Sequence, residues 1–103
     1  MVTVWYHRSV TDMDDLNENF ARLVLHLGQM AAVYFGDLAD PSGEHMDPDL
    51  AAAGQVIEIL GTLQEKTQGN LTAAEAKILE DLLYDVRLRY VEAQNGGRRI
   101  IEP

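Results

Sequence analysis

The chain has 103 residues, which favours a single domain, and its composition of 47% hydrophobic and 24% charged residues is ordinary for a soluble globular protein. No stretch approaches the roughly 18 uncharged apolar residues of a membrane span, and no secretory signal is recognisable. Eight Lys and Arg against 17 Asp and Glu leave a net charge of -9, which repels nucleic-acid phosphates and anionic lipid. The lack of cysteine excludes disulfides and thiol chemistry. We therefore expect a cytoplasmic protein.

Residues 1–12 form a separate N-terminal segment. The stretch VTVWYH is rich in β-branched and aromatic residues, which is typical of a strand. A lone strand has no partner within the chain unless it pairs with a second copy. The pattern leaves open an extended segment docked on the helices and a disordered arm.

Apolar residues at alternating intervals of four and three predict a first helix over about residues 14–35, ended by Gly36. Its predicted seam is Leu16, Phe20, Leu23, Leu27, Met30 and Tyr34, widened by Val24, Ala31 and Phe35.

A loop rich in Gly, Pro and Asp follows, and a second helix is predicted over about residues 48–67, with Asp47 as its cap and Pro48 in its first turn. Apolar residues cover about half of its circumference: Leu50, Ala53, Val56, Ile57, Ile59, Leu60 and Leu63. Gly54 and Gly61 lie on one edge, where we expect another backbone to come close.

A third helix is predicted over about residues 73–94, after a short turn at Gly69. Thr72 and Glu75 fit the capping-box pattern T-x-x-E at its start. Its predicted seam is Ala76, Leu79, Leu83, Val86, Tyr90 and Ala93, widened by Leu82. The predicted fold is all-α, a three-helix antiparallel bundle over residues 13–95, with residues 96–103 as a flexible tail.

The third helix carries a second apolar stripe, formed by Tyr84, Leu88 and Val91 at positions i, i+4 and i+7. An exposed stripe on a small domain usually marks an interface, so we expect a homodimer. Alternatively, the first helix or the N-terminal segment covers the stripe. Arg87 lies between the two stripes, and we hypothesise that Glu58 or Glu65 pairs with it and fixes the register of a homodimer or a partner helix. The alternative is an exposed ion pair of little energy.

The sequence offers little for catalysis or for binding a metal or cofactor. His7, His26 and His45 fall in three segments without metal-ligand spacing, and no nucleophile motif or phosphate loop is present. The adjacent carboxylates of Asp14 and Asp15 point in different directions on a helix, as do those of Glu80 and Asp81. We predict that the protein is not an enzyme and uses no cofactor or metal.

The favoured function is that of a homo-oligomeric interaction or adaptor module acting through helix surfaces. The alternative is a nucleic-acid- or translation-associated accessory protein that uses Arg87, Arg89, Arg98 and Arg99. A short turn followed by Arg87 and Arg89 superficially fits a helix-turn-helix. However, the first turns of the third helix are mostly acidic. The two arginines are therefore better interpreted as partners for carboxylates, such as Asp85, Glu58 or Glu92, or as supports for Tyr84 and Tyr90.

Residues 17–94 resemble a bacterial family of unknown function, DUF1844. The similarity rests on NENFARLVLHLGQMAAVYFG, on AAAGQVIEILGTLQEKTQGNL and, most specifically, on the order of turn, cap and Arg/Tyr helix in LQEKTQGNLTAAE and LEDLLYDVRLRYVE. The resemblance implies a small α-helical cytoplasmic protein. It brings no activity, cofactor or catalytic residue to carry over.

Overall fold

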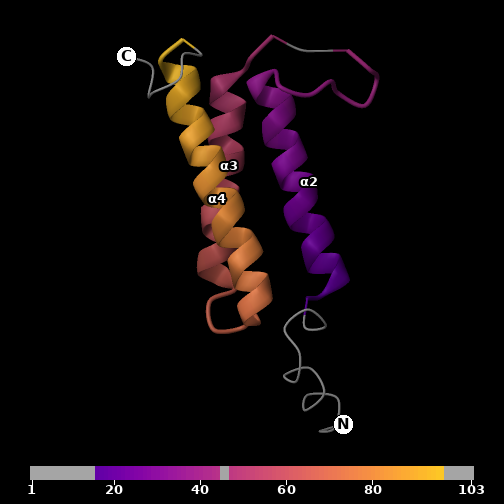
Figure 1. Ribbon diagram of the computed structural model, residues 1–103, viewed down its shortest axis with the longest axis vertical. Coiled ribbons are helices and arrows are strands. Elements are labelled where there is room, and N and C mark those ends of the chain that lie inside the picture. Colours follow the sequence, from indigo (N-terminus) through magenta and orange to yellow (C-terminus); the bar gives the residue numbers. More distant parts are fainter. Residues whose placement is uncertain (1–15, 45–46, 97–103) are drawn as a thin grey trace, which may run out of the picture.

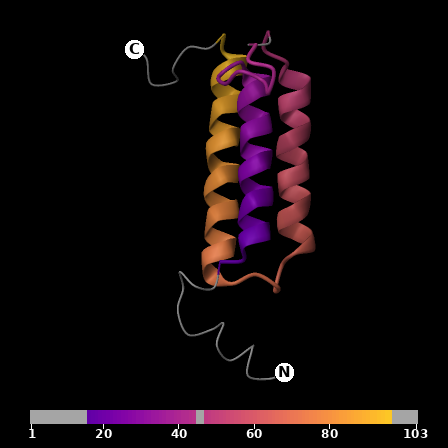
Figure 2. The same cartoon turned by 90° about the vertical axis from the view of Figure 1, so that its right-hand side faces the viewer.

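Three helices pack side by side in the part of the chain that the structure describes. The computed structural model describes residues 16–44 and 47–96. Helix α2 spans Glu18–Phe35, α3 spans Leu50–Lys66 and α4 spans Ala73–Gln94. Each helix contacts the other two, and the chain runs up α2, down α3 and up α4 (Figures 1 and 2). The predicted all-α fold with three packed helices is therefore confirmed.

The first two helices begin later than predicted. The side chain of Asn17 accepts a hydrogen bond from the Phe20 N–H at 2.9 Å, and Asn17 has an extended backbone, so α2 begins at Glu18 rather than at residue 14. Asp49, not Asp47, caps α3, because its carboxylate accepts from the Ala52 N–H at 3.0 Å. Pro48 consequently precedes the cap instead of occupying the first turn.

The capping box of α4 is confirmed and has an additional partner. The Glu75 N–H donates to Thr72 Oγ1 at 3.1 Å, and Glu75 Oε1 accepts from the Thr72 N–H at 2.9 Å. Glu75 Oε2 accepts from the N–H of Asn17 at 2.8 Å. This carboxylate is only 6% exposed. It therefore fastens the start of α2 to the start of α4.

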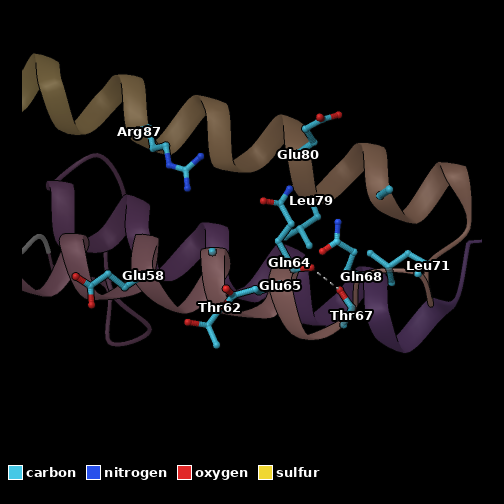
Figure 3. A pocket seen from close by; sticks show the side chains of 13 residues that line it. Glu58, Thr62, Gln64, Glu65, Thr67, Gln68, Leu71, Leu79, Glu80 and Arg87 are labelled. Atoms are coloured by element: carbon cyan, nitrogen blue, oxygen red, sulfur yellow. Dashed lines mark hydrogen bonds between the residues drawn. The ribbon is translucent and has the colours of Figure 1, made fainter.

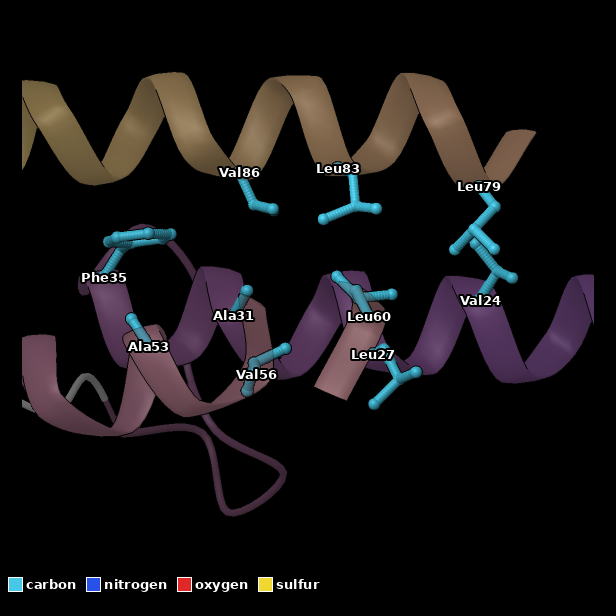
Figure 4. Close-up of a cluster of buried hydrophobic side chains, with 10 residues drawn as sticks. All are labelled: Val24, Leu27, Ala31, Phe35, Ala53, Val56, Leu60, Leu79, Leu83 and Val86. Atoms are coloured by element: carbon cyan, nitrogen blue, oxygen red, sulfur yellow. The ribbon is translucent and has the colours of Figure 1, made fainter. Parts of the chain in front are cut away.

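The core is one cluster contributed by all three helices (Figure 4). Its buried members are Val24, Leu27, Ala31, Phe35, Ala53, Val56, Leu60, Leu79, Leu83 and Val86.

The predicted seam of α2 is only partly right. Leu27 is buried, but Leu23 and Met30 are 43% and 44% exposed, and the flanking stripe with Val24 and Ala31 is buried instead. The predicted core residues Ile59 and Ala76 are exposed as well. Apolar residues cover more of each helix than two neighbours can bury. The positions of those neighbours, rather than the spacing alone, select the buried stripe.

The glycines of α3 do not mark a close approach of another backbone. A Cβ added at Gly54 would lie 3.5 Å from Tyr90 Cε1, and one at Gly61 would lie 3.7 Å from Arg87 Nη2. Both neighbours are side chains at ordinary contact distance. The tight position is Gly28 of α2, where an added Cβ would lie 3.1 Å from Leu82 Cδ1.

Several predictions concern residues outside the described ranges, among them the N-terminal segment of residues 1–12 and all but the first residue of the predicted tail of residues 96–103. Arg98 and Arg99 also lie there. Within the described residues, no helix is long and apolar enough to cross a membrane.

Candidate functional site

The apolar stripe of Tyr84, Leu88 and Val91, called here the α4 stripe, lies on the outer surface of α4. These side chains are 68%, 41% and 43% exposed. At 100° per residue, Leu88 points almost directly away from Leu79, which is fully buried. Within the described residues, neither α2 nor α3 covers the stripe. The stripe is therefore available for contact with a partner.

A groove of about 740 Å³ runs between α3 and α4 beside this stripe (Figure 3). It extends from the turn at Gly69 to Arg87, and its lining includes Glu58, Glu65 and Arg87. The structure thus brings all three charged residues of the predicted interface to one groove. Arg87 lies in α4, and its guanidinium reaches toward Gly61 of α3.

The predicted ion pair of Arg87 with Glu58 or Glu65 is not formed within the chain. Among residues 16–44 and 47–96, ion pairs within 4.0 Å join Lys77 to Asp81 and Arg89 to Asp37. In Figure 3 the Glu58 side chain points away from Arg87. The exposed guanidinium of Arg87 therefore has no carboxylate partner within the described residues.

Arg89 is engaged with a carboxylate that sequence reasoning missed. Its Nε and Nη2 donate to the two carboxylate oxygens of Asp37, each at 2.7 Å, and its guanidinium lies 5.2 Å from the centre of the Phe35 ring. The hydrogen bond from Arg89 lowers the pKa of Asp37, and the same bond raises the pKa of Arg89. Asp37 lies 52 residues away, so no local pattern could have found it.

This pairing weakens the nucleic-acid alternative. Of the four arginines that it invoked, Arg89 is neutralised by Asp37, while Arg98 and Arg99 lie outside the described residues. Arg87 remains, beside a groove whose lining also carries Glu58, Glu65 and Glu80. One cation among carboxylates is a poor phosphate-binding surface.

A second groove, of about 430 Å³, lies between α2 and α4 on another side of the bundle. Gln29 is its one polar side chain, and the remaining lining is apolar or glycine: Ala21, Val24, Leu25, Gly28, Ala32, Leu38, Ile78 and Leu82. Sequence reasoning did not identify it. The available signal was Leu25, a large apolar residue outside the predicted seam, which is 58% exposed.

The remaining charged groups offer few features of a reaction centre. Within the described residues, no group of three His, Cys, Asp or Glu side chains could hold a metal ion. The pKa of Asp40 is lowered chiefly by a hydrogen bond from Ser42, at 2.6 Å, within the loop after α2. That carboxylate also accepts from the Glu44 N–H, so it is occupied by its own loop. The described surface therefore carries apolar contact area and scattered charge.

Comparison with known proteins assigns the chain to a family. No curated protein and no solved structure matches this chain. The model of one family, described as "Domain of unknown function (DUF1844)", matches residues 17–92, which include all three helices except the last residues of α4. The chain therefore belongs to the DUF1844 family, as the sequence resemblance had indicated.

Proposed function

We propose that the protein is a small cytoplasmic interaction module that works as a homodimer through the α4 stripe. The observation that supports this is the alignment of Tyr84, Leu88 and Val91 along one exposed face, on a chain with a net charge of -9. Contiguous apolar surface costs solubility, and on small soluble domains it generally marks a contact surface.

The interface must extend beyond the stripe. A specific interface buries about 800 Å² on each partner, which is more than three side chains supply. The adjoining α3–α4 groove provides the additional surface, and Arg87 lies between the two. In a two-fold symmetric dimer the same patch faces itself, so each Arg87 faces a surface carrying Glu58 and Glu65 of the other copy. The predicted carboxylate pair of Arg87 then forms between copies, which accounts for the lack of such a pair among residues 16–44 and 47–96 of one copy.

Substitution of Leu88 by Glu tests the interface. We expect Leu88→Glu to convert a dimer into a monomer in sedimentation equilibrium, because it places two charges at the centre of the contact. Helicity should be unchanged, since the side chain faces away from the core. The matched control is Ile59→Glu, a similarly exposed position (49%) on α3, which should remain dimeric. A monomeric wild-type protein, or a dimeric Leu88→Glu variant, would contradict the proposal.

The role of Arg87 can be measured separately. We expect Arg87→Ala to weaken dimerisation, and its effect to be non-additive with that of Glu58→Ala or Glu65→Ala. If both double-mutant cycles show zero coupling and the wild-type protein is a dimer, the ion pair is not part of the interface. The apolar stripe would then be the remaining proposed contact.

A further inference from the structure

The α2–α4 groove is an apolar surface that the α4 stripe does not use. Gly28 has no side chain, and the side chain of Leu82 packs against it in this groove. Leu25 and Leu38 border it and remain 58% and 41% exposed. An apolar groove between two helices suits a segment of chain carrying apolar side chains, which is one way in which peptides are bound.

Asn17, at the start of the described chain, lies near one end of this groove. The Asn17 N–H donates to Glu75 Oε2 at 2.8 Å, which fixes the chain between the starts of α2 and α4. Ala21 and Ile78, the groove residues nearest to those starts, lie within about one and a half turns of the first residues of their helices. The start of the described chain therefore lies beside one end of the groove.

The length of this segment matches the groove. From Ala21 to Ala32 the groove follows α2 for about 16 Å, at about 1.5 Å per residue. Five extended residues span about 17 Å. Residues 7–15 can reach at most about 30 Å, enough to lead back from Leu16 along the whole groove.

The chemistry of the segment matches as well. Residues 2–6, VTVWY, place Val2, Val4 and Tyr6 on one side of an extended chain and Trp5 on the other. Residues 1–10 contain Arg8 and no carboxylate. Residues three and seven positions apart lie on the same side of a helix, so Asp85 lies on the same side of α4 as Leu82 and Ile78. Its exposed carboxylate therefore borders the groove.

We infer that the α2–α4 groove is the docking site for residues 2–6 of the same chain, with the side of the segment that carries Trp5 facing the groove and Arg8 beside the acidic border of α4. The DUF1844 match begins at residue 17, so the docked segment is an addition to the family domain. It shields Leu25 and Leu38 from water and leaves the α4 stripe open to a second copy.

The test uses Trp5, the one tryptophan of the chain. In the full chain we expect its emission to be blue-shifted and its quenching by acrylamide to be severalfold weaker than in the urea-unfolded chain. Leu25→Glu should restore quenching to the unfolded value. Circular dichroism should show unchanged helicity, because Leu25 lies outside the core. The control Ile59→Glu should leave Trp5 protected.

Three results would overturn the inference. Trp5 quenched equally in the native and unfolded chains would show that nothing covers it. Protection that disappears on dilution would assign the groove to a second copy. Protection that survives Leu25→Glu but is lost in Leu88→Glu would place the segment on the α4 stripe, and the proposed dimer interface would then fail with it. Loss in Leu25→Glu alone supports the groove, whatever the oligomeric state of the protein.

Discussion

The two ends of the bundle are held together by different chemistry. At the end where α2 and α4 begin, the carboxylate of Glu75 is 6% exposed and accepts two backbone N–H groups, one of them 58 residues away. At the other end, Asp37 and Arg89 form two short hydrogen bonds, but their side chains are 44% and 30% exposed. Water competes with Arg89 for the exposed carboxylate of Asp37, but it has little access to the buried carboxylate of Glu75. Burial, rather than the number of hydrogen bonds, should therefore decide which end matters more for stability.

The largest effect should come from Glu75→Gln. The amide offers one oxygen where the carboxylate offers two, so one of the N–H groups of Thr72 and Asn17 faces an NH₂ group instead of an acceptor. Loss of a buried hydrogen-bond acceptor costs about 1–3 kcal/mol, and each kcal/mol lowers the melting temperature of a domain this size by roughly 4–8 °C. Thermal unfolding by circular dichroism measures it.

The matched control is Glu80→Gln, an exposed carboxylate on the same helix, which should unfold within about 0.5 kcal/mol of wild type. Equal effects of the two substitutions would show that the buried carboxylate does not hold the two helix starts together.

A smaller and pH-dependent effect is expected for Asp37→Asn. Because Arg89 lowers the pKa of Asp37 in the folded chain, the pair contributes stability above the unfolded pKa of about 3.8. That contribution is lost as the pH falls through the lower, folded value. Solvent screening limits it to about 1 kcal/mol at neutral pH. Urea unfolding of both proteins from pH 7 to pH 2 should show their difference shrinking towards the acid end.

A difference between wild type and Asp37→Asn that persists unchanged at pH 2 would show that packing of the loop, and not the ionised pair, is responsible. The control is Asp81→Asn, which removes the ion pair of Asp81 with Lys77 within α4. That pair is more exposed, since the side chains of Asp81 and Lys77 are 60% and 73% exposed. This substitution should change stability less than Asp37→Asn.

The smallest effect, with the opposite sign, is expected for Gly54→Ala. The new Cβ would meet Tyr90 Cε1 at 3.5 Å, an ordinary contact, while alanine removes the conformational cost of glycine within a helix. We expect a gain of roughly 0.5 kcal/mol in urea unfolding. Gly28→Ala is the matched control and should gain less, because its Cβ would lie 3.1 Å from Leu82 Cδ1. Destabilisation by Gly54→Ala would mean that α3 and α4 are packed more tightly there than these distances indicate.

The candidate site was predictable to the extent that it depends on one helix. The spacing of Tyr84, Leu88 and Val91 was sufficient to expect an outward stripe, because helical geometry fixes which residues share a face. The partner of Arg89 and the α2–α4 groove were not predictable. Both depend on which faces of two helices meet, and no interval along the chain encodes that.

The sequence by itself determined the three helices, the capping box of Thr72 and Glu75, and the stop at Gly36, whose φ of 84° suits glycine. These features arise from interactions among residues a few positions apart, so the local order of residues is enough to specify them. Only the tertiary structure decided that Val24 and Ala31 rather than Leu23 and Met30 enter the core, and that Glu75 also holds Asn17. Each helix carries more apolar surface than its neighbours can cover, so its rotation is settled when all three pack together.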